Sequence, residues 1–337
     1  ISQTDVLPIN ETLAINNNAR PLKRLFDEGK VAIVQGIGYP NSNRSHFRGM
    51  DIWHTCEPDR VGSEGWLGLA IRDLDPKNEN VLTGVNIGQG LPRAMSVAGV
   101  PVTSVGDLEG YGVMNKIEQE RLKERSLQAF KDIYGQAIGS GQVAEYIGKT
   151  GLDVLKGADL LANVATQYKS SVEYADNSIA KSLRDVARVH FADLGTRVFY
   201  TNHGGYDTHA NEMPTHPKLL SDLSGAISDF MDDLKEHDAA DDVAILVFTE
   251  FGRRMRDNGS GTDHGSGGGA FLIGNNVKGG LYSEYPSLNP NDWEHGEDLK
   301  HTIDFRGIYG TVLEQWLGLD AKPIVKGEFE QIKPFYI

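Results

Sequence analysis

Five short, mostly apolar runs constrain the fold of this chain more than any other feature. They lie at residues 31–34, 81–87, 197–200, 243–248 and 270–273, and turn-forming residues bound them. β-Branched runs of this length suit strands that are buried on both faces of a mainly parallel sheet. The runs therefore predict an α/β protein whose sheet has helices packed on both sides.

Helical patterns occupy the gaps between several of these runs. The clearest pattern leads straight into the run at 243–248 and places these apolar residues on one face: Leu219, Leu223, Ile227, Phe230 and Leu234. An amphipathic helix between two strands is the usual crossover connection of a parallel sheet. Because strand and helix alternate along the chain, we expect a three-layer α/β/α sandwich.

Residues 113–177 break this alternation, since they show a helical pattern and no convincing strand. No internal repeat, low-complexity tract or Pro/Ser-rich linker divides the chain. We therefore expect a single domain over residues 1–337 that carries 113–177 as a helical insertion or cap.

Charge and cysteine content exclude several classes of partner and site. With 47 acidic and 33 basic residues, the formal net charge of −14 opposes binding to nucleic acid. The single cysteine, Cys56, excludes an intrachain disulfide and any multi-cysteine metal site, so metal ligands have to come from His, Asp and Glu. No apolar run approaches the roughly 18–20 residues of a membrane span. The N-terminus lacks Met and a signal-peptide pattern, as expected of a processed chain.

Four segments concentrate the polar residues, at 40–47, 202–209, 249–254 and 261–269. Three of them directly follow predicted strands, and the fourth precedes one. Ligands of α/β sheets bind outside the carboxyl ends of the strands, so we expect these segments to meet in one crevice.

The segments at 202–209 and 261–269 carry the histidines best placed to bind a metal. Asp207 and His209 offer a carboxylate and an imidazole two residues apart, beside a double glycine that lets the chain bend sharply. His264 lies at the centre of a glycine-rich loop, a composition that suits close approach of the backbone to a ligand. The alternatives are a turn whose polar side chains bind only backbone, and a flexible surface loop.

The segments at 249–254 and 40–47 offer groups for catalysis. Glu250 emerges from a buried strand as a ligand or general base, and Arg253 can hold an oxyanion; alternatively the two form an ion pair. Ser45 begins a predicted helix, where the N–H groups and the helix dipole suit an anionic ester, so it is a candidate nucleophile. The alternative is that Ser45 is an ordinary helix N-cap.

Taken together, these segments resemble the domain-of-unknown-function 1501 family, which is grouped with the alkaline phosphatase and sulfatase superfamily. The resemblance covers nearly the whole chain in order, and its motifs lie at 33–40, 43–47, 204–209, 249–254, 261–265, 277–281 and 304–306. It implies a sandwich with two metal sites and a Ser or Thr nucleophile that takes a phosphoryl or sulfuryl group. It also implies an exported, periplasmic protein.

The resemblance assigns a role to each candidate residue. The expected catalytic residues are Ser45 as nucleophile, Arg253 as oxyanion partner, and Arg44 beside the nucleophile. The expected metal-binding residues are Asp207, His209 and His264 for one ion, Glu250 for the other, and Asp263 next to His264.

Two departures from the family pattern keep alternatives open. Family members share an N-terminal strand with a Gly-Gly-x-Asp-Gly segment, and this chain begins after that point. Phe251 also stands where the superfamily usually has His. These departures leave open that the chain holds one ion or none. The expected cofactor is a divalent metal, Zn, Mn or Ca, as one or two ions.

Three functional hypotheses result. The first is a metal-dependent hydrolase of phosphate or sulfate esters, with a small anionic ester as substrate. The second is a secreted binding or scaffold protein that has kept the fold and lost metal chemistry. The third is a metal-independent esterase that uses Ser45 with His and Asp. The substrate, the identity of the metal and the oligomeric state are left open.

Overall fold

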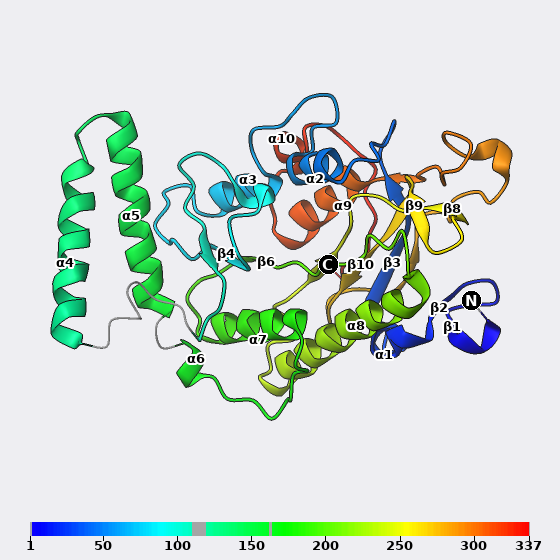
Figure 1. Ribbon diagram of the computed structural model, residues 1–337, viewed down its shortest axis with the longest axis horizontal. Helices are drawn as coiled ribbons and strands as arrows, with labels where there is room; N and C mark the ends of the chain where they lie inside the picture. Colours follow the sequence, from blue (N-terminus) through cyan, green and yellow to red (C-terminus); the bar gives the residue numbers. More distant parts are fainter. Residues whose placement is uncertain (1, 110–118, 162–163, 337) are drawn as a thin grey trace. The chain divides into compact units, whose positions relative to one another are not determined.

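A computed structural model describes residues 2–109, 119–161 and 164–336 of the chain. The chain divides into two compact units. The first comprises Ile1–Trp66, Ser170–Lys181 and His203–Ile337, and the second comprises Leu67–Lys169 and Ser182–Asn202. Each unit contains its own sheet (Figure 1).

The first unit is built on a mixed five-stranded sheet. Its strands are β3 (Val31–Gly38), β7 (Ile245–Val247), β10 (Gly268–Ile273), β11 (Gly280–Tyr282) and β12 (Ile303–Asp304). The strand order is β11-β3-β10-β7, and β12 also pairs with β3. Strands β11 and β12 run parallel to β3, whereas β10 runs antiparallel to both of its neighbours.

The antiparallel direction of β10 differs from the mainly parallel sheet expected from the apolar runs. Between β7 and β10 the chain forms only a small hairpin, β8 (Arg253–Asp257) with β9 (Thr262–His264), and no helix. A parallel connection needs a crossover of a dozen or more residues, usually helical, so the chain returns in the antiparallel direction instead. An antiparallel strand that is buried on both faces has the same continuous apolar run.

Five helices complete the described part of the unit. They are α1 (Arg20–Asp27), α2 (His46–Thr55), α8 (Glu212–Glu236), α9 (Phe305–Thr311) and α10 (Ala321–Val325). Of these, α1 contacts β3 and α9 contacts β12. A π-helical turn (Val312–Trp316), short 3₁₀ turns and the hairpin of β1 (Val6–Pro8) with β2 (Ala14–Asn16) fill the remainder. The helix predicted to lead into the run at 243–248 is α8, and its Ile227, Phe230 and Leu234 are buried as expected.

An aromatic cluster holds α2 in place. Trp53 of α2 stacks on Phe305 of α9 with ring centroids 4.4 Å apart, and also on Phe248 at the end of β7, at 5.6 Å. Trp53 and Phe305 are at most 1% exposed. Each aromatic side chain of this kind buries roughly 150–250 Å². This packing fixes the helix whose first residue, His46, enters the candidate site.

The second unit contains a three-stranded parallel sheet with the order β5-β4-β6. Its strands are β4 (Gly84–Ile87), β5 (Thr103–Val105) and β6 (Val198–Tyr200). Its helical elements include most of α3 (Trp66–Leu74) and of α7 (Ser178–Phe191), and a 3₁₀ turn at Arg93–Met95.

The segment predicted as a helical insertion, 113–177, lies mostly in this unit. Its described part contains α4 (Glu120–Ala137), α5 (Gln142–Leu161) and α6 (Val164–Gln167), and no strand; residues 113–118 and 162–163 lie outside the described residues. Helices α4 and α5 lie side by side (Figure 1).

The chain is thus a mixed α/β protein, as the sequence predicts, with all five predicted strands present in shorter or longer form. They are divided between two sheets in two units. Among the described helices, none combines the length and apolar character needed to cross a membrane.

Candidate metal centre

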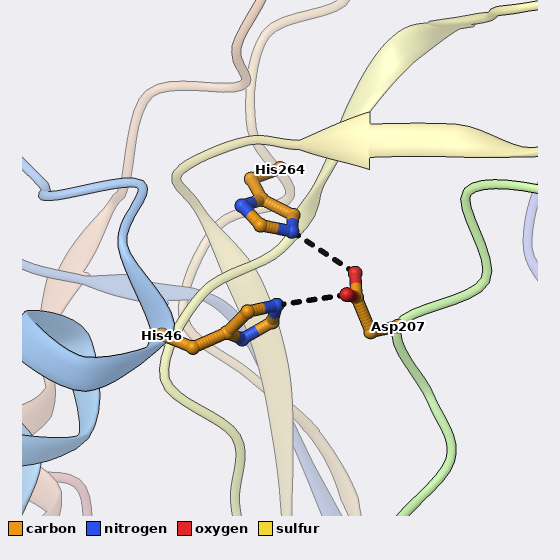
Figure 2. A group of neighbouring side chains, drawn as sticks. All are labelled: His46, Asp207 and His264. Atoms are coloured by element: carbon orange, nitrogen blue, oxygen red, sulfur yellow. Dashed lines mark hydrogen bonds and ion pairs between the residues drawn. The ribbon is translucent and has the colours of Figure 1, made fainter.

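Three side chains from distant parts of the sequence meet in the first unit. His46 is the first residue of α2, Asp207 lies in the loop between β6 and α8, and His264 ends β9 (Figure 2). One ligand atom from each lies within 4.8 Å of those of the other two. The Asp207 carboxylate lies between the rings, with Oδ2 3.1 Å from His46 Nε2 and Oδ1 2.9 Å from His264 Nε2. The group has the composition and spacing of a metal-binding triad.

A third imidazole approaches the same carboxylate. His209 Nε2 lies 3.0 Å from Asp207 Oδ1 and 2.8 Å from His264 Nε2. The side chains are accessible from solvent, since His264 is 21% exposed and Asp207 45%. The four side chains therefore form a group that a small ligand can reach.

The other ring nitrogen of each histidine, Nδ1, is held by an oxygen acceptor. The acceptors for His46, His209 and His264 are, in that order, Glu250 Oε1 at 2.6 Å, Asp263 Oδ1 at 2.9 Å and the backbone oxygen of Arg44 at 2.6 Å. An ionised carboxylate or a carbonyl oxygen can only accept, so each Nδ1 carries the hydrogen. In a neutral ring this leaves the lone pair on Nε2, and all three Nε2 atoms face Asp207.

His46 Nε2 gives independent evidence for this arrangement. It is buried and makes no hydrogen bond of acceptable geometry, although Asp207 Oδ2 is only 3.1 Å away. A buried polar atom without a partner costs roughly 1–3 kcal/mol, so such atoms call for a specific explanation. A shared cation between Nε2 and the carboxylate fits this geometry.

Charged neighbours stabilise the ionised form of Asp207. Partial burial alone raises its pKa, but the hydrogen bond from the Arg253 guanidinium and the neighbouring imidazoles of His264 and His46 outweigh burial and hold the pKa well below the usual range. Arg253 Nη1 lies 2.9 Å from Asp207 Oδ1. For His46, burial lowers the pKa, and the nearby carboxylates of Glu250 and Asp207 more than offset it, so that the pKa lies above its ordinary value. Asp207 is therefore an anion over the whole neutral range.

Tyr206, next to Asp207, ties the loop to α8. Its hydroxyl donates to the carbonyl oxygen of Leu219 at 3.2 Å, and His203 Nδ1 lies 2.9 Å from the same hydroxyl. Since the hydroxyl hydrogen is used on Leu219, His203 Nδ1 is the donor to Tyr206. Burial raises the pKa of Tyr206 and lowers that of His203, so both side chains stay neutral. This contact fixes the start of the segment that carries Asp207 and His209.

Glycines allow the segments to approach one another. A Cβ at Gly261 would lie 2.1 Å from the carbonyl oxygen of Thr208, and one at Gly265 would lie 2.7 Å from the carbonyl carbon of Arg253. The glycine-rich loop, expected to bring backbone close to a ligand, instead brings it close to neighbouring backbone. Its effect is to place His264 beside the loop that carries Asp207.

The proposed nucleophile, Ser45, is the N-cap residue of α2. Its side chain is exposed and makes no capping hydrogen bond, so its hydroxyl is not used to satisfy the helix end. It directly precedes His46, and its backbone N–H is bound by Asn43 Oδ1 at 2.8 Å.

The two predicted catalytic arginines point at carboxylates. Arg44 binds the fully buried Asp298 through Nε at 2.9 Å and Nη2 at 2.7 Å, so only its backbone oxygen reaches His264. Arg253 binds Asp207 through Nη1 and Thr262 through its other nitrogens. Of the two guanidinium groups, that of Arg253 contacts the candidate centre.

The predicted metal-binding residues thus fall into two groups. Asp207, His209 and His264 converge with their ligand atoms, as expected. Glu250 and Asp263 do not face the common point between these ligand atoms. Each instead accepts a hydrogen bond from the Nδ1 of a histidine. Sequence reasoning did not place His46 in this group. The signal for it was its position at the start of a helix that follows the central strand β3.

Phe251 packs against two histidines of the centre. It is 6% exposed, and its ring centroid lies 5.0 Å from that of His46 and 4.8 Å from that of His264. An apolar ring here supplies no ligand, but it restricts the motion of two histidines.

Comparison with known proteins supports a family assignment. No curated protein matches the chain, and no solved structure matches it. The profile of a family described as a protein of unknown function (DUF1501) matches residues 38–326, which include every residue of the centre. The chain belongs to this DUF1501 family.

Proposed function

We propose that the centre binds a divalent metal ion through His46, His209, His264 and Asp207, and that the protein is a metal-dependent hydrolase of phosphate or sulfate esters. The observation that carries the metal site is the common orientation of three imidazoles. Each has Nδ1 bound to an acceptor and Nε2 directed at one ionised carboxylate. Metal-binding histidines are almost always held in this way through the second nitrogen.

The donor set favours some ions over others. Imidazole nitrogens with one carboxylate suit Zn²⁺ and related transition metals, whereas Ca²⁺ takes six to eight oxygen ligands. Of the expected ions, Zn²⁺ and Mn²⁺ therefore fit better than Ca²⁺. We propose one ion for all four side chains, because the positions expected to serve a second ion do not offer free ligand atoms. Glu250 is bound to His46, and the ring of Phe251 stands where a further imidazole was expected.

The hydrolase proposal rests on what surrounds these ligands. A metal ion bound here would supply Lewis acidity and lower the pKa of an oxygen nucleophile. The chain itself supplies a candidate nucleophile, Ser45, exposed next to His46 and unused as a cap. The N–H groups at the start of the ten-residue helix α2 favour anions, and Arg253 adds a positive charge beside Asp207. The substrate class that fits is a small anionic ester.

The family resemblance extends the proposal. It suggests the three-layer α/β/α sandwich of the alkaline phosphatase-like superfamily, with 113–177 as a helical insertion or cap, and an exported protein. Cell fractionation of the native organism tests export, and an experimental structure tests the sandwich.

One observation favours the non-catalytic alternative. Arg253 already neutralises Asp207, and each histidine has a hydrogen-bond partner, so the group is electrostatically balanced without a metal. A scaffold protein that keeps this cluster as a structural network has the same geometry.

Elemental mass spectrometry on chelator-free protein separates these readings. We expect about one equivalent of metal in the parent after reconstitution with Zn²⁺ or Mn²⁺, and loss of that metal in His264→Asn. His295→Asn is the matched control, because His295 is exposed and lies outside the centre. A parent protein without metal removes the metal proposal and leaves the scaffold reading.

Turnover of aryl phosphates and aryl sulfates tests the reaction itself. Metal-dependent turnover that Ser45→Ala abolishes, while metal content stays at the parent level, supports the assigned nucleophile. Metal binding without turnover of either ester class refutes the hydrolase. Activity that survives a chelator supports the metal-independent esterase instead.

A further inference from the structure

A cavity of about 310 Å³ lies beside the central strand of the first unit. Its wall is formed by β3, β10, β11, the hairpin of β1 with β2, and the segment at 285–286. Six of its lining residues are Ile or Leu, and all six are only partly buried: Ile9, Leu13, Ile15, Ile33, Leu281 and Leu299. An apolar cavity of roughly 150 Å³ is large enough for benzene, so this one has room for a small organic molecule.

The wall carries no charge that is free to bind a ligand. Among the described residues that line the cavity, only Arg253 is charged. Its guanidinium already binds the Asp207 carboxylate and both oxygens of Thr262. A charged ligand would lose hydration in this cavity without gaining an opposite charge. The composition of the wall therefore favours a neutral ligand with an apolar body.

One polar side chain of the wall has an unused hydrogen-bonding atom. The amide nitrogen of Gln35, Nε2, donates to the carbonyl oxygen of Ser283 at 3.0 Å. Because a carbonyl oxygen can only accept, this bond fixes the orientation of the amide. Gln35 Oε1 is buried and accepts no hydrogen bond from any described residue. A buried acceptor without a donor is unfavourable, so a ligand with a hydroxyl or N–H group is the one that this wall stabilises best.

A bulge in the central strand lies next to Gln35. The pairing of β3 with β10 shifts between Gly268 and Gly269, and the extra residue is Gly36 of β3. Gly36 has a φ of +63°, a value that residues with a side chain rarely adopt. β-Bulges redirect neighbouring side chains and are common beside functional sites. The irregular part of β3 thus coincides with the polar part of the cavity wall.

We propose that this cavity binds a small neutral molecule with an apolar body and one hydroxyl or N–H donor, and that Gln35 Oε1 accepts the hydrogen bond from that donor. The apolar body contacts the partly buried Ile and Leu side chains, which lose further contact with water when the ligand binds. None of the four proposed metal ligands is among the described residues that line the cavity. The inference is therefore independent of the metal centre.

Titration of the full chain with phenol and with toluene tests the proposal, because the two probes have nearly the same shape and only phenol has a donor. Phenol is expected to shift the methyl NMR signals of Ile9, Ile15 and Ile33 with a dissociation constant of about 1 mM or below. In Gln35→Leu the ratio of the phenol constant to the toluene constant is expected to rise at least about fivefold over that of the parent, since the phenol hydroxyl then has no acceptor. Comparing ratios cancels the different hydration of the two probes.

Gly269→Val obstructs the cavity from its wall. Apart from its chain neighbours, the nearest atom to a Cβ at Gly269 would be the carbonyl oxygen of Val34 at 3.7 Å, so the variant is expected to fold. It is expected to lose binding of both probes. Gly106→Val is the matched control, because Gly106 is also exposed, follows β5 of the second unit, and places a Cβ 3.7 Å from the Gln89 side chain. It is expected to bind both probes like the parent.

Circular dichroism and thermal unfolding without probe show whether each variant is folded. Three results overturn the proposal. The first is a parent whose methyl signals phenol does not shift in a saturable way. The second is a ratio of constants that Gln35→Leu leaves unchanged. The third is binding that survives in folded Gly269→Val, which places the probes elsewhere on the chain. If Gly269→Val does not fold, the ratio measured in Gln35→Leu still decides the question.

Discussion

Replacing Glu250 with alanine removes the acceptor that orients one proposed metal ligand. Glu250 Oε1 lies 2.6 Å from His46 Nδ1, and the Glu250 side chain is 14% exposed. Without this acceptor the His46 ring is free to turn, and its hydrogen can move to Nε2, where it blocks the metal. We expect Glu250→Ala to weaken metal binding although Glu250 itself contacts no metal.

The size of the effect follows from the bond that is lost. A hydrogen bond to a charged group contributes about 1.5–3 kcal/mol. Loss of the outer partner of a metal-binding histidine typically costs about 10–100-fold in affinity, which corresponds to about 1.4–2.8 kcal/mol. The two ranges agree, so the expected loss is about 10–100-fold in the dissociation constant for Zn²⁺.

Competition against a chromogenic chelator measures this constant in the parent and two Glu250 variants. Glu250→Gln keeps a carbonyl oxygen that can accept from Nδ1, so it is expected to retain most of the affinity. Thr249→Ala is a control for the rest of the Glu250 environment, because it removes only the exposed hydroxyl that donates to Oε2 at 2.8 Å. Thermal unfolding without metal separates loss of folding from loss of binding.

Either of two results refutes the reasoning. If Glu250→Ala binds Zn²⁺ as tightly as the parent, His46 needs no orientation by Glu250 or does not bind the ion. If Glu250→Gln is as damaged as Glu250→Ala, the charge of Glu250 matters rather than its hydrogen bond.

Two further predictions concern stability. Gly261→Ala places a Cβ 2.1 Å from the carbonyl oxygen of Thr208 and is expected to cost about 1–3 kcal/mol in urea unfolding. Gly135→Ala, in the interior of α4 with no atom near the added Cβ, is expected to be neutral or to stabilise by up to about 1 kcal/mol; equal effects of the two contradict the packing argument. Burial lowers the pKa of His203, so its contribution to stability is present above about pH 6.5 and is lost as pH falls through the lowered value. Over that acid range the unfolding free energy is expected to fall less steeply in His203→Asn, by up to about 1.4 kcal/mol per pH unit, and not to change slope in His295→Asn.

The sequence predicted those elements that are buried and therefore have a clear apolar pattern. Strands β3, β7 and β10 and helix α8 belong to this class, and each was expected at nearly its observed position. The strand pair β8 and β9 was not expected. Strand β8 contains three arginines and an aspartate and lies partly exposed at an edge, so its sequence has no apolar signal. Strand direction was also not predictable from hydrophobicity. A strand that is covered on both faces has the same continuous apolar run whether it pairs parallel or antiparallel to its neighbours.

The sequence predicted which segments of the chain come together at the centre. It was less informative about which side-chain atoms contact one another there. Segments at strand ends converge for topological reasons, so the sequence predicted that Asp207, His209 and His264 lie close together. The distinction between a ligand and the group that orients it depends on about 3 Å of side-chain position. Glu250 and Asp263 were therefore assigned as ligands, whereas the structure places them on the Nδ1 atoms of histidines.

The packing of α2 decides which of its residues reaches the centre. Trp53 stacks on Phe305, and a Cβ at Gly49 would lie 3.2 Å from the Glu250 side chain, so this face of the helix is turned inward. His46 lies seven residues before Trp53, which is almost two helical turns, and therefore on the same face.

The start of α2 also determines why the sequence marks Ser45 more clearly than His46. Phe47 follows His46 by one residue, which is about 100° around the helix, and its side chain is 93% exposed. The inward direction of His46 thus depends only on where the helix begins, and Ser45 marks that point because serine is a preferred N-cap. Interpreting Ser45 as a cap does not compete with a functional site at this position. An N-cap at Ser45 fixes where α2 begins and hence its helical register. That register directs the side chain of His46, the next residue, at Asp207.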